Sequence, residues 1–278
     1  MRIRAASLNY RDLLVGRGIG RWAPPPGRIL GSDGAGEVVA VGEGVAWPAI
    51  GQRVIGAFLP GWLDGPMTAA KMTGGLGGAV RDGVFADYVL LDAASTVAAP
   101  AHMTDAEAAT LVCAGVTAWQ ALSRADSLHP DRSVLVQGTG GVSLMALQMA
   151  HAAGARVIAT SSRNDKLRHA AELGAWAGVN YRTHENWDDE AIRLTGGVGV
   201  EHVVDVGGAA TLERSVAAVA YEGTVSLVGL LGGARAGLDV VAVHLRGIRL
   251  QGIETGSRAM LDRLARWSEA VSLRPAIG

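Results

Sequence analysis

The residues most suggestive of chemistry form a glycine-rich turn in the stretch LVQGTGGVSLMALQ, residues 135–148. Gly138 and Gly140 match the first two positions of the dinucleotide fingerprint G-x-G-x-x-G, and Ser143 stands where the third glycine is expected. The first glycine makes the turn, the second lets the backbone approach a pyrophosphate, and the third allows a helix to pack closely on a strand. Because serine is also small, Ser143 alters only the third role. Taken alone, the turn could bind a dinucleotide or be a tight structural turn without a ligand.

The segments around the turn favour the dinucleotide interpretation. The apolar strand VLV precedes it, a helical stretch follows, and Gly154 ends that stretch just before a second apolar strand, RVIAT. This order is a complete βαβ unit, in which the N–H groups at the start of the helix can bind an anion. The residues expected to contact the cofactor at the turn are Gly138, Thr139, Gly140, Gly141 and Val142.

The end of the second strand indicates which dinucleotide is bound. An acidic residue is expected there if the ribose 2′-hydroxyl is to be held, but the chain continues with Thr160, Ser161, Ser162 and Arg163, and Lys166 follows. Hydroxyls and cations suit a 2′-phosphate, so we expect NADPH to be preferred over NADH. The alternative is that the two cations are only solvated residues at the start of a helix.

The chain of 278 residues has two parts with different sequence patterns. Residues 1–98 contain short β-rich segments broken by Gly and Pro, and they predict a small β-rich domain. Residues 99–263 alternate short apolar strands with helices, beginning with a capping box at Thr104 and Glu107. This alternation predicts an α/β, doubly wound parallel sheet.

Composition excludes several classes of function. The formal net charge of −1 gives no basic field for nucleic acid. The N-terminus lacks the apolar core of a signal peptide, and no apolar run is long enough to span a membrane. Cys113 is the single cysteine, which rules out a disulfide within the chain. We therefore expect a cytoplasmic protein without a nucleic-acid or membrane partner.

Four stretches together resemble the medium-chain dehydrogenase/reductase superfamily: GAGEVVAVGEGV, AATLVCAGVTAWQAL, VLVQGTGGVSLMALQMA and VVDVGG, in this order along the chain. The resemblance covers essentially the whole chain. It implies a GroES-like catalytic domain over residues 1–98 and a Rossmann domain over residues 99–263, with residues 264–278 beginning the return to the catalytic domain. The family usually has a further β-hairpin before RIRAASLNYRD and further segments after LRPAIG, so we expect the catalytic domain to be incomplete, with unpaired strand edges.

Zinc members of this superfamily hold a catalytic metal with an early cysteine, a histidine in a G-H-E stretch and a cysteine in an A-x-x-x-C-A-G stretch. Here Asn9 has the first place, Ser32 and Asp33 replace the histidine and glutamate, and only Cys113 is retained. A catalytic zinc needs about three protein ligands. Asp33 and Asp12 are possible oxygen ligands, but one thiol with Asn9 and Ser32 does not complete the set, so we expect no metal. The resemblance then narrows to the zinc-independent, quinone-oxidoreductase-like branch.

That branch implies a small-molecule electrophile, either a quinone or an α,β-unsaturated carbonyl, because a conjugated acceptor spreads the added charge itself. The catalytic candidates are Asn9, Tyr10 and Ser32, where the metal would otherwise lie. Asn9 and Tyr10 could equally form a structural turn. Further cofactor contacts are expected at the following residues: Thr117, Tyr181, Gly207, Val228, Gly229 and Leu230.

Two other functions stay open on the sequence. One is an alcohol or aldehyde dehydrogenase of the same family, and the other is a nucleotide-binding protein that has lost catalysis. We also expect a homodimer formed by pairing edge strands of the Rossmann sheet, with TVSLVGLL or HLRGIRLQGI as the edge.

Overall fold

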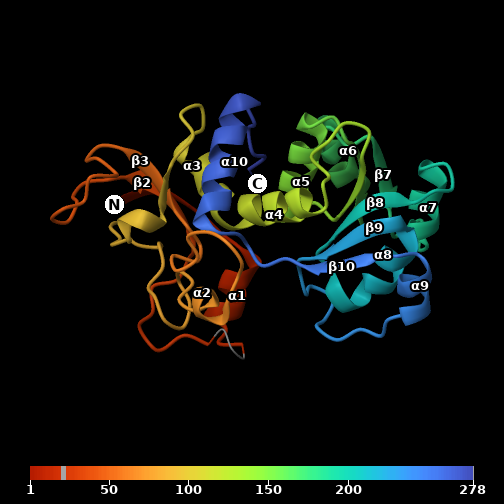
Figure 1. The fold of residues 1–278 in the computed structure, drawn as a ribbon, viewed down its shortest axis with the longest axis horizontal. Helices are drawn as coiled ribbons and strands as arrows, with labels where there is room; N and C mark the ends of the chain where they lie inside the picture. The colour runs from red at the N-terminus through yellow and green to blue at the C-terminus, as the bar shows by residue number, and fades with distance from the viewer. Residues whose placement is uncertain (20–22, 278) are drawn as a thin grey trace. The chain divides into compact units, whose positions relative to one another are not determined.

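The computed structural model describes residues 1–19 and 23–277, and the chain divides into two units. Unit 1 comprises Met1–Val116 and Thr255–Gly278, and unit 2 comprises Thr117–Glu254 (Figure 1). These boundaries differ from the predicted ones at residues 98 and 263. The reason is packing: helix α3 (Asp105–Ala109) contacts the sheet of unit 1, and α10 (Arg258–Ala270) contacts a strand of the same sheet.

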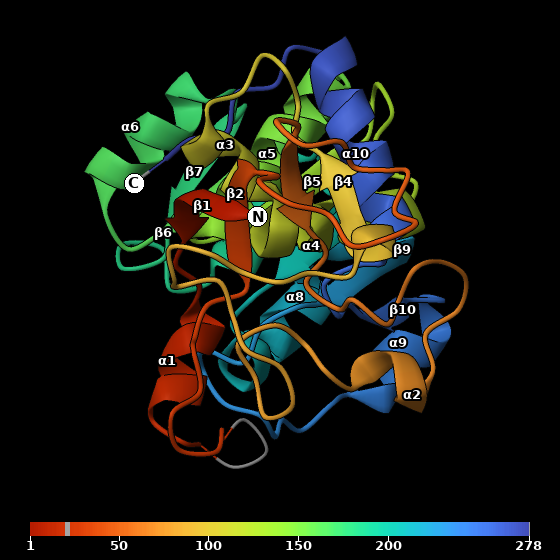
Figure 2. The same ribbon diagram turned by 90° about the vertical axis from the view of Figure 1, so that its left-hand side faces the viewer.

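Unit 1 is built on an antiparallel four-stranded sheet. Its strands, in spatial order, are β1 (Arg2–Ser7), β2 (Asp33–Glu37), β3 (Arg53–Gly56) and β4 (Thr96–Ala98). Helix α10 packs on β4, although the two come from distant parts of the sequence (Figure 2). Helix α1 (Tyr10–Gly16) follows β1, and the short helix α2 (Ala69–Met72) lies in the long connection after β3.

The segment that leads out of unit 1 begins with the predicted capping box, which is confirmed. The Thr104 hydroxyl accepts from the Glu107 N–H at 3.2 Å, and the Glu107 carboxylate accepts from the Thr104 N–H at 2.7 Å. A π-helical turn, Leu111–Gly115, follows α3 and carries Cys113. Turns of this kind are rare and often lie at functional sites. Helix α4 (Val116–Arg124) continues from it into unit 2.

Unit 2 contains a six-stranded sheet in the order β10-β9-β8-β5-β6-β7, and each pair of neighbours is parallel. Figure 1 shows helices on both faces of this sheet, which confirms the predicted doubly wound α/β fold. The strands are β5 (Ser133–Gln137), β6 (Arg156–Ser161), β7 (Ala177–Asn180), β8 (Val200–Asp205), β9 (Val219–Leu227) and β10 (Arg249–Gly252). The helices are α5 (Gly141–Ala152), α6 (Asn164–Glu172), α7 (Trp187–Leu194), α8 (Leu212–Ala218) and α9 (Val240–Leu245).

The core of unit 2 lies between the sheet and its helices, where valines of β8 and β9 meet Trp187 and Ala191 of α7. Strand β9 lies inside the sheet, between β10 and β8. The prediction that TVSLVGLL offers an exposed edge is therefore wrong, whereas β10, within HLRGIRLQGI, is an edge strand. Among the described residues, no helix has both the length and the apolar character needed to cross a membrane.

Candidate functional site

The carboxyl edge of the sheet in unit 2 gathers most of the predicted cofactor contacts. Strands β5, β6, β7, β8 and β9 are parallel, so their ends lie on one edge, where ligands of doubly wound sheets bind. The predicted residues at or just after these ends are Gly138–Val142, Ser161–Arg163, Tyr181, Gly207 and Val228–Leu230. Thr117 lies apart from them in sequence, buried in the first turn of α4.

The glycine turn has the geometry that a pyrophosphate requires. Gly138 has φ +71°, a left-handed conformation that favours glycine. A Cβ atom added at Gly138 or Gly140 would meet nothing within 4 Å, so the backbone is open on this side. Helix α5 begins at Gly141 and presents its free N–H groups there. The residues of the turn therefore fit the phosphates of a dinucleotide.

Ser143 does more than provide a small side chain. It is buried in α5, and its hydroxyl donates a hydrogen bond to the Gln137 carbonyl oxygen at 2.6 Å. A hydroxyl has one proton to donate, so this proton is engaged within the turn. Ser143 thus ties the first turns of α5 to the end of β5, directly across the glycines.

The predicted 2′-phosphate residues follow β6, and one of them has an internal partner. The Arg163 guanidinium makes two hydrogen bonds to Asp165, from Nε to Oδ1 at 3.0 Å and from Nη2 to Oδ2 at 2.5 Å. Ser161 is buried, whereas Arg163 and Lys166 are exposed. The Tyr181 N–H donates to the Ser161 carbonyl at 3.1 Å, which places Tyr181 beside the end of β6.

Unit 1 carries a second cluster, around Asp33. Ser32 and Asp33 are both fully buried, and the Ser32 hydroxyl donates to Asp33 Oδ1 at 2.6 Å. The backbone N–H of Cys113 donates to Asp33 Oδ2 at 3.1 Å. Asn9 precedes α1, and its N–H donates to the Asp12 carboxylate at 2.8 Å. Asp33 therefore joins β2 to the π-helical turn, and the predicted residues Asn9 and Ser32 lie beside it.

The environment of Asp33 disfavours its charged form. The pKa of Asp33 is raised to about 7, mainly by burial and to a smaller extent by the nearby Asp12 carboxylate. Hydrogen bonds from Ser32, Asn9 and the Cys113 N–H act in the opposite direction but only partly compensate. The pKa of Asp12 is also raised, chiefly by burial. Asp33 can therefore hold a proton near neutral pH.

Close backbone packing fixes the position of Ser32 and Asp33. The Gly83 N–H donates to the Ile29 carbonyl at 2.7 Å and the Val84 N–H to the Gly31 carbonyl at 3.0 Å. A Cβ atom on Gly83 would lie 2.1 Å from the Gly31 oxygen, so only glycine allows this approach. The long connection after β3 thus packs directly against the residues before Asp33.

The donor set in this cluster does not fit a catalytic zinc. Cys113 offers a thiol, but Asn9 offers only an amide, and the Ser32 hydroxyl donates a hydrogen bond to Asp33. Asp33 accepts hydrogen bonds at both carboxylate oxygens. Within the described part of the chain, no three His, Cys, Asp or Glu side chains are grouped so that they could hold a metal ion. No chemical step is therefore assigned to a metal here.

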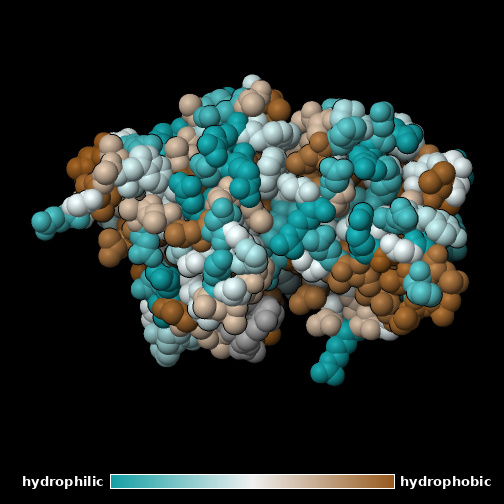
Figure 3. Space-filling view, in the orientation of Figure 1, coloured by the Kyte–Doolittle hydropathy of each residue, from teal (hydrophilic) through white to brown (hydrophobic). Residues whose placement is uncertain are grey.

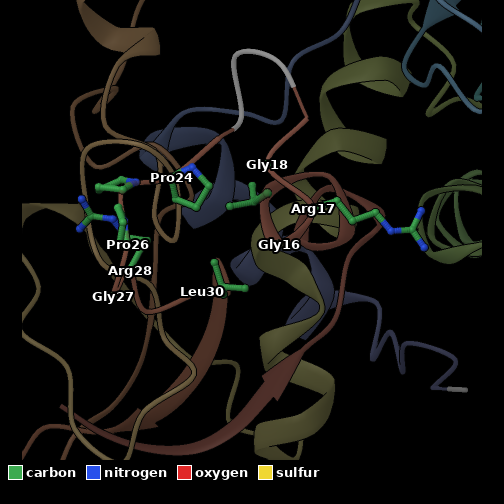
Figure 4. Close-up of a pocket in the computed structure, with 10 residues that line it drawn as sticks. Gly16, Arg17, Gly18, Pro24, Pro26, Gly27, Arg28 and Leu30 are labelled. Carbon is green, nitrogen blue, oxygen red and sulfur yellow. The ribbon is translucent and has the colours of Figure 1, made fainter.

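A shallow pocket of about 440 Å³ lies elsewhere in unit 1, between the end of α1 and the segment Pro24–Leu30 (Figure 4). Its charged side chains are Arg17 and Arg28, and Arg28 pairs with Asp82 at 2.9 Å. Its described lining residues include no carboxylate, thiol or imidazole, and we assign no chemistry to it.

Comparisons with known proteins agree with the fold. Residues 1–101 match the alcohol dehydrogenase GroES-like domain, and residues 141–271 match the zinc-binding dehydrogenase family. The zinc-type alcohol dehydrogenase-like protein C1773.06c of Schizosaccharomyces pombe is 40% identical over all of this chain and 82% of its own length. The chain belongs to the medium-chain dehydrogenase/reductase superfamily, among its alcohol dehydrogenase-like oxidoreductases.

Solved structures support the same assignment. A Sinorhizobium meliloti 1021 protein, provisionally assigned as an alcohol dehydrogenase, has a TM-score of 0.92 at 43% identity, covering 99% of this chain and 81% of its own. An NAD-dependent alcohol dehydrogenase has a TM-score of 0.89 at 36% identity, covering 100% of this chain and 82% of its own. The family implies a nicotinamide cofactor, whose phosphates the turn at 138–142 fits.

Three residues of these clusters were not identified as site residues from the sequence. The sequence marks Asp33 as a replacement for a family glutamate and as a possible oxygen ligand of a metal. It does not single out Gln137 and Asp205, the buried residues that end β5 and β8. A signal for Asp205 exists, because a carboxylate that ends the apolar run of β8 must find hydrogen-bond donors inside the protein. No comparable signal exists for the contact between Asp33 and the distant Cys113 backbone.

Proposed function

We propose that this protein transfers hydride from NADPH to a quinone, an enone or a related conjugated carbonyl, without zinc. The observation that carries the proposal is the donor set around Asp33, in which Cys113 is accompanied by Asn9 and Ser32 rather than by further metal ligands. A zinc ion would polarise an isolated carbonyl. A conjugated acceptor delocalises the incoming charge and depends less on such an ion.

Each cluster has a distinct task in this reaction. A bound nicotinamide dinucleotide supplies the hydride. The N–H groups of residues 138–142 bind its pyrophosphate. In unit 1, we assign the exposed Tyr10 to donate a hydrogen bond to the acceptor oxygen. The side-chain nitrogen of Asn9 is buried, so we assign Asn9 to the cluster around Asp33. Ser32 is fully buried, so we assign it to holding Asp33 rather than to contact with the substrate.

The preference for NADPH rests on the end of β6. Ser161, Ser162 and Arg163 supply donors for a 2′-phosphate, provided that Arg163 exchanges its bond to Asp165 for one to the phosphate. Replacing Arg163 with Ala should weaken NADPH binding by about 1.5–3 kcal/mol, the scale of a hydrogen bond to a charged group. NADH affinity should barely change. Equal weakening of both cofactors would show that the 2′-phosphate is bound elsewhere.

The alternative is an alcohol or aldehyde dehydrogenase, which the names of the relatives favour. Protein purified without a metal-binding tag should oxidise NADPH with 9,10-phenanthrenequinone, retain this activity with a chelator, and contain far less than one zinc per chain. Zinc-dependent oxidation of a simple alcohol, without quinone reduction, would instead support the alternative. Cofactor binding without either activity would indicate a nucleotide-binding protein that has lost catalysis.

We also propose a homodimer that pairs the β10 edges of two copies into one continuous sheet. Figure 3 shows apolar surface over the region of β10 and α9. Val240, Val241 and Leu245 of α9 are more than half exposed. Association would cover both this surface and the unpaired strand edge. Sedimentation as a monomer at micromolar concentration would contradict the proposal.

A further inference from the structure

A buried hydrogen-bond network joins the strand ends that surround the glycine turn, and Asp205 is at its centre. Asp205 is the last residue of β8 and is fully buried. Its Oδ1 accepts from the Gly208 N–H and the Thr211 hydroxyl, each at 2.8 Å. Its Oδ2 accepts from the Ser215 hydroxyl at 2.6 Å and the Gln137 amide at 3.2 Å. Four donors fill the acceptor capacity of the carboxylate.

Gln137 extends this network to the cofactor turn. It is the last residue of β5, immediately before Gly138. The backbone pairing of β5 with β8 ends at Val136 and Val204. Beyond that point the Gln137 side-chain oxygen accepts from the N–H groups of Val206 and Gly207, at 3.2 and 3.3 Å. The side chain thus continues the connection between the two strands after their backbones diverge.

The turn after β8 is also held against the turn after β9. The Val228 N–H donates to the Asp205 carbonyl at 2.8 Å, and the Gly232 N–H to the Gly207 carbonyl at 2.7 Å. A Cβ atom on Gly229 would lie 2.3 Å from the Val206 oxygen, so the two backbones are in direct contact. A displacement of residues 206–208 must therefore move residues 228–232.

We infer that Asp205 is a positioning residue for the dinucleotide, which sets the turns after β5, β8 and β9 relative to one another through Gln137 and residues 206–211. This inference rests on the proposed function, because it assigns these turns to cofactor binding. Asp205 itself is buried beneath the turns and contacts no cofactor.

Asp205→Asn tests the inference because it keeps the shape and changes one acceptor into a donor. The new side-chain amide has two orientations. In one its NH₂ group faces the Gly208 N–H, and in the other it faces the Gln137 NH₂ group. Neither of these groups can accept a hydrogen bond. A buried donor left unpaired is costly, so the turns should shift. We expect the Kd for NADPH to rise at least about tenfold in folded protein. Thr211→Val, which removes one donor only, should raise it about threefold.

His202→Gln is the matched control. His202 is also fully buried on β8, but it bonds to Ser127 and Ser226, each at 2.9 Å, away from the strand end. This variant should lower the melting temperature while leaving the Kd for NADPH unchanged. If Asp205→Asn and Thr211→Val behave like the control, with lower melting temperatures and a Kd within twofold of wild type, Asp205 is merely structural and the inference fails.

Isothermal titration of NADPH into wild type and the three variants separates this inference from the proposed function. Binding by wild type with weakened binding by Asp205→Asn and Thr211→Val supports both. If Asp205→Asn does not fold, Thr211→Val alone tests the inference: a higher Kd for NADPH supports it, and a Kd within twofold of wild type overturns it. Wild type that binds neither NADPH nor NADH would overturn the proposed function, and this inference with it.

Discussion

The raised pKa of Asp33 predicts an unusual dependence of stability on pH. Its value changes from 3.8 in the unfolded chain to about 7 in the folded one, mainly through burial. A carboxyl group that is harder to ionise in the folded state stabilises the fold fully below pH 3.8, and this contribution is lost as the pH rises through 7. At 1.36 kcal/mol per pKa unit, the free energy of unfolding decreases by about 4 kcal/mol in total, and about 2.5 kcal/mol of this decrease falls between pH 5 and pH 8.

Asp33→Asn should remove this loss, because the amide has nearly the same shape and cannot ionise. Its oxygen can still accept from the Cys113 N–H, and its NH₂ group can donate to the Ser32 hydroxyl. Free energies of unfolding would be measured in urea at pH 5 and pH 8. Between pH 5 and pH 8, the free energy of unfolding of the variant should rise by about 2.5 kcal/mol relative to that of wild type.

Asp82→Asn provides the control for Asp33→Asn. The Ile29 N–H and Arg28 hold the pKa of Asp82 below its ordinary value, so this exposed carboxylate is ionised at both pH values. Its variant should differ from wild type by the same amount at pH 5 and pH 8. A difference for Asp33→Asn that is likewise constant would refute the argument that burial keeps Asp33 protonated near neutrality.

Three further predictions concern unit 2. Ser143→Val should weaken NADPH binding more than Ser143→Gly. Both variants lose the hydrogen bond to the Gln137 carbonyl, but only valine adds a methyl group for which the buried site has no room. Equal Kd values for NADPH in the two variants would contradict this. Asp165→Asn should tighten NADPH binding relative to NADH by freeing Arg163, and an unchanged ratio of the two Kd values would count against it. Burial lowers the pKa of His202 from 6.5 to about 3, so this group should cause stability to fall as the pH decreases below 6.5. In urea unfolding, the stability of His202→Gln should fall less than that of wild type as the pH decreases below 6.5. An equal fall in both proteins would contradict the lowered pKa of His202.

Local patterns accounted for much of unit 2 and for the start of α3 in unit 1. The βαβ unit, the capping box at Thr104 and the gathering of Ser161, Tyr181 and Gly207 at one sheet edge all follow from short stretches of sequence. These features depend on interactions between near neighbours and on the fixed direction of parallel strands. The confirmed fold class followed from the same alternation of strands and helices.

Features set by distant contacts could not be predicted in this way. The pattern of α3 indicates that one face is buried, but not that this face packs on the sheet of unit 1. Arg163 was placed beside the 2′-phosphate position, yet its pairing with Asp165 depends on the conformations of two exposed side chains. The bond between Asp33 and the Cys113 N–H joins residues 80 positions apart.

The division of unit 1 into two stretches of sequence affects how the chain folds during synthesis. Thr117–Glu254 forms a continuous unit and can fold as it leaves the ribosome. Unit 1 cannot be completed then, because α10 must still pack on β4 and on the turn at Leu111–Gly115, and Arg274 must pair with Glu107 at 2.9 Å. Translating residues 117 to 254, which number 138, takes roughly 7 to 28 s at about 5–20 residues per second. For that interval the apolar surface awaiting α10 is open to chaperones and to neighbouring nascent chains.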